Sequence, residues 1–259
     1  MALLEELKKF LKSILLWIYF FLGFTIFFFG FGFKQIEFLE KKILLPMPSI
    51  YSFSAQFFKH IQQNLLPPQV KIVVLNPLNA FLAQIMIALS LSFIFTSPIL
   101  LYGLTKFISP ALYEKEKKII LKVVGFSSIL FILGCLFSYF ILAPSTFKIL
   151  YSFATVLEAS PLFTAYEFVN LTFILVIAVG IMFQLPIFMV LLSNLGLVSS
   201  DFWKNNYKYI FLFFLIFSAI ITPDGTGVTM LLLFLPLAGL YFLGYILILK
   251  NKKIIKSRK

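Results

Sequence analysis

Long runs of apolar residues recur along this chain, and they leave few folds open to it. The first run covers residues 13–33, and about 20 apolar residues in a helix suffice to cross the hydrocarbon core of a bilayer. A water-soluble fold of 259 residues could not bury several such runs, because its interior is limited and exposed apolar patches aggregate. The runs therefore predict an all-α integral membrane protein.

The composition of the chain supports the same class. Hydrophobic residues make up 61% of the positions and charged residues 12%, and the mean hydropathy is +1.02. Soluble domains have roughly 45–50% apolar and about 25% charged residues. Lipid is therefore the expected solvent for most of this surface.

The apolar runs predict six transmembrane helices within one membrane domain that covers residues 1–259. Their predicted bounds are 13–33, 78–104, 119–142, 168–192, 209–222 and 228–249. We expect the first to be a retained helix rather than a signal peptide, since no small-residue cleavage site follows it. Ala143 and Pro144 are expected to close the third helix, and residues 145–167 to form an outer connection. Residues 34–77 are the one sizeable predicted extramembrane segment, with short helical patches at most.

The fifth predicted helix is unusually short. A helix over residues 209–222 would be about 21 Å long, against a hydrocarbon core of roughly 30 Å. Such a helix must thin the bilayer locally or lie behind its neighbours.

Charge patterning predicts the orientation in the membrane. The net charge of +12 would suggest a nucleic acid partner for a soluble protein, but here the lysines flank apolar runs, so membrane lipids are the expected partner and nucleic acid is not. With both termini on one side, that side collects sixteen basic residues and the other side six. The positive-inside rule then places both termini in the cytoplasm, for a multi-pass protein of the cytoplasmic (inner) membrane.

The residues needed for most catalytic sites are missing from the sequence. Cys135 and His60 are the only cysteine and histidine, so neither an intramolecular disulfide nor a His- or Cys-ligated metal site can be built from this chain alone. There is no phosphate-binding G-x-x-x-x-G-K loop and no serine placed for His60 to activate. We therefore predict no enzyme activity, no cofactor and no metal. A small-solute secondary transporter is the main alternative, disfavoured because the runs carry so few charges, and a membrane-embedded hydrolase is a third.

Few polar residues lie within the apolar runs. Gln184 is the clearest, and it has two readings: a helix–helix hydrogen bond inside the bundle, which spacing alone favours, or a polar site opened by the kink expected at Pro186. Asp224 reads as a turn former or as a carboxylate below headgroup level that needs a cationic or amide partner. Glu6, Glu114 and Glu116 read as solvated, self-paired carboxylates or as a site for a cationic peptide.

The hairpin after the second run carries a recognisable motif. Residues 107–118 read FISPALYEKEKK, which resembles the F-x-x-P-A-L-Y-x-x-E-[RK]-[RK] signature of the TatC family, the polytopic subunit of the twin-arginine protein translocase. Three further stretches agree in order: Glu167-Phe168 at the start of the fourth span, residues 183–186 as the F-[EQ]-x-P motif, and residues 222–224 within the T-P-x-D turn. The resemblance covers nearly the whole chain, with residues 34–77 matching least.

This resemblance implies a glove-shaped bundle of six helices that is not an enzyme. It further implies a receptor that binds twin-arginine signal peptides of folded cargo, recruits single-span TatA-like and TatB-like partners, can self-associate, and works with the proton-motive force.

The implied residues fall into two groups. The signal-peptide group is Glu6, Lys8, Phe107, Pro110, Glu116, Lys117 and Lys118. The intramembrane or partner-binding group is Gln184, Pro186, Asp224 and Glu167. Carboxylates suit this cargo because they bind the planar guanidinium of arginine bidentately.

The chain departs from the family pattern at two positions. The N-terminal pattern L-x-E-L-[RK]-x-R-L maps onto residues 4–11 with Phe10 in place of its second basic residue. Gln184 stands where many relatives have glutamate, so no mechanism that needs an ionisable acid there transfers to this chain.

Overall fold

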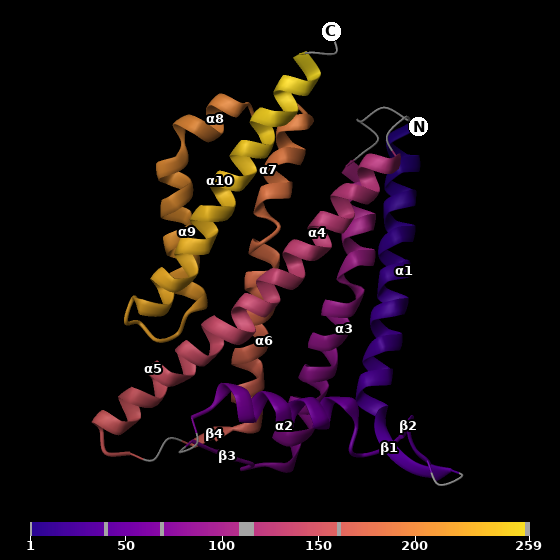
Figure 1. The fold of residues 1–259 in the computed structure, drawn as a ribbon, viewed down its shortest axis with the longest axis vertical. Helices are drawn as coiled ribbons and strands as arrows, with labels where there is room; N and C mark the ends of the chain where they lie inside the picture. The colour runs from indigo at the N-terminus through magenta and orange to yellow at the C-terminus, as the bar shows by residue number, and fades with distance from the viewer. Residues whose placement is uncertain (1, 39–40, 68–69, 109–116, 160–161, 257–259) are drawn as a thin grey trace. The chain divides into compact units, whose positions relative to one another are not determined.

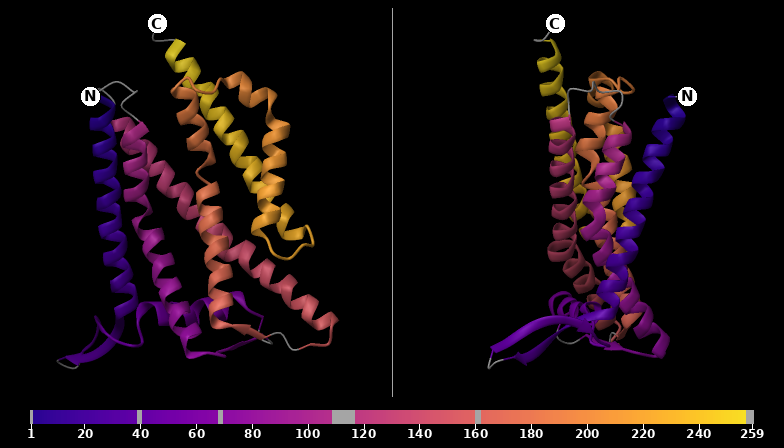
Figure 2. Two further views of the ribbon diagram at one scale, coloured as in Figure 1. Left: turned by 180° about the vertical axis from the view of Figure 1, so that it is seen from behind. Right: turned by 90° about the vertical axis from the view of Figure 1, so that its right-hand side faces the viewer.

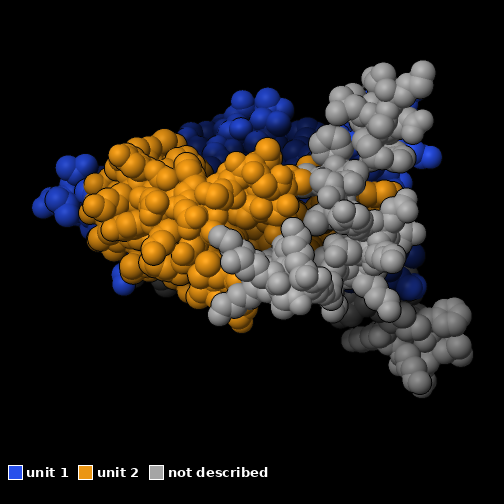
Figure 3. Space-filling view, turned by 90° about the horizontal axis from the view of Figure 1, so that it is seen from above, with its two compact units in different colours: residues 1–100, 147–174 blue, residues 101–146, 175–259 orange. Residues whose placement is uncertain are grey.

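The computed structural model describes residues 2–38, 41–67, 70–108, 117–159 and 162–256. Within these ranges five helical stretches are long and apolar enough to cross a membrane: Phe10–Gly30, Pro77–Lys106, Val123–Val156, Ala165–Asn194 and Val228–Lys250. The chain divides into two compact units, one of residues 1–100 and 147–174 and the other of residues 101–146 and 175–259 (Figure 3). Each unit is described in turn.

The first unit is built on two long helices, α1 (Ala2–Gly30) and the greater part of α3 (Pro77–Ile108), which lie side by side (Figures 1 and 2). The indole Nε1 of Trp17 donates to the hydroxyl of Thr96 at 3.1 Å. Phe24 and Phe28 of α1 both contact the ring of Phe95. Aromatic packing and one polar contact therefore join these helices.

Between α1 and α3 the first unit forms a cap at one end of the helices (Figure 1). The antiparallel strands β1 (Phe31–Phe38) and β2 (Lys41–Pro48) make a hairpin, which is followed by helix α2 (Phe53–Leu65). Strand β3 (Lys71–Val73) then pairs in parallel with β4 (Leu162–Thr164). Residues far apart in sequence thus meet in this cap.

The second unit contains the helices of the C-terminal half of the chain (Figure 1). They are α4 (Lys117–Phe137), the end of α6 (Ala165–Met182), α7 (Leu185–Asn194), α8 (Ser200–Asn205), α9 (Tyr207–Ile221) and α10 (Val228–Lys256). Helix α10 packs along both α7 and α9. Phe211 of α9 contacts the rings of Phe234 and Tyr241 of α10, so aromatic residues dominate this interface as well.

Many hydroxyl groups within the helices donate to backbone carbonyls of the same helix, which suits a lipid environment. Among the described residues, the buried hydroxyls of Ser138 and Ser218 have no hydrogen-bond partner. Ser92 and Thr96 donate to backbone carbonyls four residues earlier at 2.6 and 2.7 Å. Pro98 lacks an N–H and so leaves the carbonyl of Ile94 without its helical donor. The hydroxyl of Ser97 donates to that carbonyl at 2.8 Å, which lets α3 continue through the proline.

The prediction that Ala143 and Pro144 close the third helix was wrong. A π-helical turn, Ser138–Leu142, joins α4 to α5 (Ala143–Val156), and the N–H of Ala143 donates to the carbonyl of Ser138. Proline is tolerated in the first turn of a helix, where its missing N–H matters least. The result is one apolar stretch of 34 residues, Val123–Val156, roughly 50 Å long at the helical rise.

The expectation for residues 34–77 was also incomplete. The hairpin β1–β2, which begins at Phe31 and runs into this segment, was not predicted. The 13-residue helix α2 is longer than the short helical patches expected. By contrast, the short fifth apolar helix is confirmed: α9 has 15 residues, Tyr207–Ile221.

Candidate functional site

Gln184 lies where the fourth apolar stretch is interrupted. Helix α6 ends at Met182 and α7 begins at Leu185, with Phe183 and Gln184 forming the turn between them. Pro186 sits in the first turn of α7 and cannot donate a backbone hydrogen bond. The carbonyl of Met182 therefore lacks its helical donor, and the N–H of Gln184 donates to the carbonyl of Ile181 at 3.0 Å in a tight turn. The predicted kink at Pro186 is therefore a break of the helix.

The side chain of Gln184 pairs with Ser127 of α4, a residue that sequence reasoning missed. The hydroxyl of Ser127 donates to Oε1 of Gln184. Nε2 of Gln184 in turn donates to the carbonyl of Ser127 at 3.0 Å. The structure thus contains the helix–helix hydrogen bond that spacing alone had favoured. A carboxamide has two donors and two acceptor sites, so this pair leaves part of its capacity unused.

Glycines allow close helix contacts on both sides of the break. A Cβ atom on Gly134 of α4 would lie 2.9 Å from the Cα of Gly180 and 2.8 Å from the ring of Phe183. On α10, a Cβ atom on Gly244 would lie 3.0 Å from the Cα of Pro186. The Gln184 break is therefore held between α4 and α10 by contacts that only glycine permits.

Asp224 occupies the turn between α9 and α10 and is 5% exposed. Its carboxylate accepts hydrogen bonds from the hydroxyls of Thr226 and Thr229. Gly225 and Gly227 have φ angles of 61° and 77°, a region that glycine adopts without strain. Of the two readings of Asp224, these contacts agree with the turn former: its partners are two hydroxyls from the turn and the start of α10, and not a cationic or amide group.

These contacts determine the charge state of Asp224. Burial raises the pKa of its carboxyl group, but the hydrogen bonds from Thr226 and Thr229 outweigh burial and hold the pKa below its ordinary value. The carboxylate also lies at the N-terminal end of α10, where the helix dipole favours negative charge.

Glu167 forms a capping box at the start of α6. The N–H of Thr164 donates to the Glu167 carboxylate at 3.1 Å, and the N–H of Glu167 donates to the Thr164 hydroxyl at 3.2 Å. The T-x-x-E spacing of residues 164–167 is the sequence signal for this motif. The structure therefore gives Glu167 a local role at the helix end.

Most residues of the predicted signal-peptide group cannot be placed side by side. Lys8 is exposed on α1. Pro110 and Glu116 lie outside the described residues, and the side chains of Glu6 and Phe107 are likewise not described. Lys117 and Lys118 begin α4, but their side chains are also outside the described set.

The connection between α7 and α9 is tied down by a second pair of contacts that the sequence did not reveal. Nε1 of Trp203 in α8 donates to the hydroxyl of Ser193 at 3.0 Å. The hydroxyl of Tyr241 in α10 donates to the carbonyl of Trp203. The short helix α8 is thereby bonded to the end of α7 and to the middle of α10.

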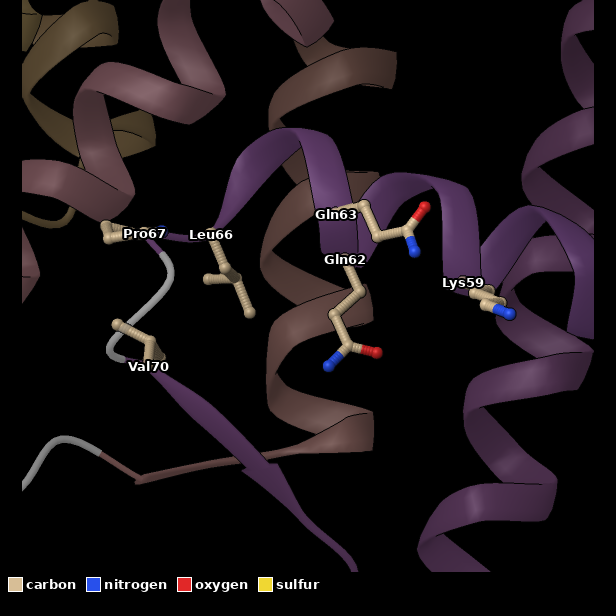
Figure 4. A pocket seen from close by; sticks show the side chains of 6 residues that line it. All are labelled: Lys59, Gln62, Gln63, Leu66, Pro67 and Val70. Carbon is tan, nitrogen blue, oxygen red and sulfur yellow. The ribbon is translucent and has the colours of Figure 1, made fainter.

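An open hollow of about 380 Å³ lies beside α2 in the first unit (Figure 4). Its lining residues are Lys59, Gln62, Gln63, Leu66, Pro67 and Val70. Lys59 and Gln63 are exposed and Gln62 is half-buried, so the hollow has no deeply buried polar side chain to anchor a ligand, and we assign none to it.

The described helices and their polar contacts define a polytopic membrane protein. The chain matches the family model described as Sec-independent protein translocase protein (TatC) over residues 2–236. The Sec-independent protein translocase protein TatC of Cenarchaeum symbiosum is 32% identical over 234 residues, which are 90% of this chain and 89% of that protein. The protein of the same name from Aquifex aeolicus is 33% identical over 214 residues, or 80% of this chain and 88% of the relative.

A solved structure agrees with these relatives. The crystal structure of a twin-arginine translocase receptor, TatC, superposes with a TM-score of 0.72 and 28% sequence identity, covering 93% of this chain and 97% of that one. The chain belongs to the TatC family. It is therefore the receptor subunit of a twin-arginine translocase, a transport protein rather than an enzyme.

Proposed function

We propose that this receptor binds the twin-arginine signal peptides of folded cargo with its N-terminal segment and the hairpin between α3 and α4. The proposed binding residues are Glu6, Lys8, Phe107, Pro110, Glu116, Lys117 and Lys118. The motif at residues 107–118, within a chain that matches the family over residues 2–236, is the observation that carries this proposal. The two arginines of the signal peptide carry two planar guanidinium groups, and each can bind a carboxylate bidentately.

The second part of the proposal concerns single-span partners of the TatA-like and TatB-like kind. We propose that a polar group on such a partner forms a hydrogen bond with the Gln184 carboxamide, which has one donor and one acceptor site beyond its bonds to Ser127. Gln184 lies at the break between α6 and α7, next to Pro186. Glu167 and Asp224 contribute by fixing the helix ends on which this surface depends, since each is bonded within its own turn. Self-association of the receptor belongs to the same proposal.

The proposed arrangement in the membrane has six crossings within one domain. It adds α9, the fifth crossing in chain order, to the five long apolar helices, and α9 crosses in a locally thinned bilayer. Both termini lie in the cytoplasm by the excess of basic residues on that side, and the proton-motive force drives transport. The small-solute transporter considered from the sequence is set aside, because family membership now identifies a translocase subunit.

Photocrosslinking of a twin-arginine peptide to two variants tests the cargo site. We expect Glu116→Ala to abolish crosslinking and Glu114→Ala to reduce it little, because Glu116 occupies the carboxylate position of the motif and Glu114 a variable one. A desolvated, charge-assisted pair is worth several times the ~0–1 kcal/mol of an exposed pair. Equal and small losses in both variants would identify the hairpin carboxylates as a solvated loop and reject the site.

A further inference from the structure

We propose that the base of the β1–β2 hairpin docks into the bilayer interface, in the leaflet reached by the C-terminal end of α1. The docking surface comprises Leu45, Met47, Ile50 and Tyr51 and is called the interfacial patch below. Its occupant is the lipid headgroup and upper acyl-chain region, not another protein. The proposal needs only that α1 spans the membrane, and it is independent of the cargo and partner sites.

The hairpin starts at the membrane end of α1 with no linker. Helix α1 ends at Gly30 and β1 begins at Phe31. The N–H of Ser49, just after β2, donates to the carbonyl of Gly30 at 3.0 Å and closes the base of the hairpin on the helix end. In Figures 1 and 2 the hairpin runs crosswise to α1. With α1 across the bilayer, the hairpin therefore lies along the membrane surface.

The interfacial patch is strongly exposed for a set of large apolar side chains. The exposed fractions are 96% for Ile50, 55% for Tyr51, 44% for Leu45 and 38% for Met47. The patch continues the surface of α1, of which only 6% of the membrane-spanning window is buried within the protein. Because β1 follows α1 directly, the patch lies close to the end of the lipid-covered helix, and tyrosine is a residue enriched at membrane–water boundaries.

Contacts inside the first unit hold the patch in this position. The ring of Phe33 packs edge-on against Phe53 of α2 with centroids 4.6 Å apart, and Phe31 stacks on Phe27 of α1. A Cβ atom on Gly32 would lie 2.1 Å from the carbonyl oxygen of Tyr51. The hairpin base is therefore packed tightly against residues 51–53.

The neighbouring helix α2 has the opposite character on its exposed side. Lys59, His60, Gln63 and Asn64 are its exposed residues from position 59 onward. Polar residues on α2 beside apolar residues on the hairpin describe a boundary between water and lipid. Leu45 and Met47, two residues apart on β2, share one face of that strand, so the hairpin presents that face to the interface.

Collision-accessibility electron paramagnetic resonance tests the proposal in vesicles of phosphatidylcholine and phosphatidylglycerol. Nitroxide labels are placed singly by Leu45→Cys, Met47→Cys and Ile50→Cys, with Lys59→Cys and Gln63→Cys as exposed controls on α2, all in a Cys135→Ala background. We expect oxygen to relax the labels at 45, 47 and 50 more than a water-soluble nickel chelate does. The order should reverse at 59 and 63.

Two outcomes overturn the proposal. Labels at 45, 47 and 50 that respond to the nickel chelate as strongly as the controls place the hairpin in water. Labels shielded from both oxygen and chelate place a protein surface over the patch. All substitutions are at exposed positions apart from Cys135→Ala, and elution of each variant as one species in detergent verifies that it is folded.

Discussion

At the break between α6 and α7, the side chain of Gln184 forms hydrogen bonds to a neighbouring helix, α4. The carboxamide bonds both the hydroxyl and the carbonyl of Ser127, so one residue joins α4 to the break. A glutamate at this position could form a similar pair only while protonated. Glutamine forms this pair without a titrating group. In this chain the residue can therefore form hydrogen bonds but cannot take up or release a proton.

Replacing Gln184 tests whether it also serves a partner helix. We expect Gln184→Leu to weaken co-purification of a single-span partner by about 0.5–2 kcal/mol, the scale of hydrogen bonds in membranes, or roughly 2- to 30-fold. Gln184→Glu should be tolerated, because a protonated carboxyl group can donate one bond and accept others. The receptor itself should still fold, since the freed Ser127 hydroxyl can bond a backbone carbonyl of its own helix.

The matched control for this prediction is Ser127→Ala. It removes the hydroxyl that donates to Gln184 but leaves the carboxamide available to a partner, so co-purification should persist. Equal losses of partner in Ser127→Ala and Gln184→Leu, or no loss in either, would assign Gln184 to the bundle alone.

Asp224 should make stability depend on pH in a defined direction. Its folded-state pKa is below the ordinary value, so its ionised form stabilises the fold at neutral pH. That contribution is complete above the unfolded pKa of about 3.9 and is lost as the pH falls from there through the lower folded value. We expect Asp224→Asn to lower the thermal midpoint at pH 7, and the gap to wild type to narrow below about pH 4.

Thermal unfolding in detergent at a series of pH values measures this effect. Hydrogen bonds to a charged group contribute about 1.5–3 kcal/mol each, so the difference at pH 7 should be readily resolved. Asp201→Asn, at an exposed position on α8, is the control and should change little. A gap between wild type and Asp224→Asn that stays constant through the acid range contradicts the assignment.

At the scale of helices, glycine pairs set how closely α4 and α6 approach. Gly134 faces Gly180 and Phe183, whereas Gly125 on the same helix has no atom within 4 Å of an added Cβ. Gly134→Ala should therefore destabilise the protein by about 1–3 kcal/mol through overpacking. Gly125→Ala should be neutral or stabilising by up to about 1 kcal/mol, because alanine favours helix more than glycine does.

The buried thiol of Cys135 provides the measurement for this pair. A maleimide dye that fluoresces on reaction reports when the thiol becomes accessible on heating. Both variants replace glycine by alanine on α4 and differ only in position. If the temperature midpoints of dye labelling shift by the same amount and in the same direction in both variants, the α4–α6 contact does not depend on Gly134.

The same helices show which features could be predicted from the sequence and which could not. Helix positions were predictable because each crossing needs a run of apolar residues, and the break near Pro186 followed from the missing N–H of proline. The prediction at Pro144 failed because proline commonly ends a helix, and the sequence pattern does not indicate the π-helical turn after which the helix continues. The Ser127–Gln184 pair joins residues 57 positions apart, and no local pattern specifies such a partner. The capping box at residues 164–167 and the hydroxyls around Asp224 were local and could have been found.

At the scale of the whole molecule, the lengths of the helices are strongly unequal. The stretch Val123–Val156 has 34 residues and α9 has 15, or roughly 50 Å and about 22 Å of helix. One exceeds a bilayer core of ~30 Å and the other falls short of it. The longer helix must tilt or extend beyond the bilayer core. The shorter helix requires the bilayer to be thinner around it.

Cysteine labelling in intact cells tests the membrane orientation on which the cargo site depends. In a Cys135→Ala background, an impermeant maleimide should react with His60→Cys and Ser160→Cys but not with Glu116→Cys or Asp201→Cys, because the excess of basic residues assigns the last two to the cytoplasm. His60 and Asp201 are both exposed, so a difference between them reports sidedness and not burial. Permeabilised cells should label all four positions. Reaction at position 116 in intact cells would place the hairpin outside, away from cytoplasmic signal peptides, and would remove the basis of the proposed binding site.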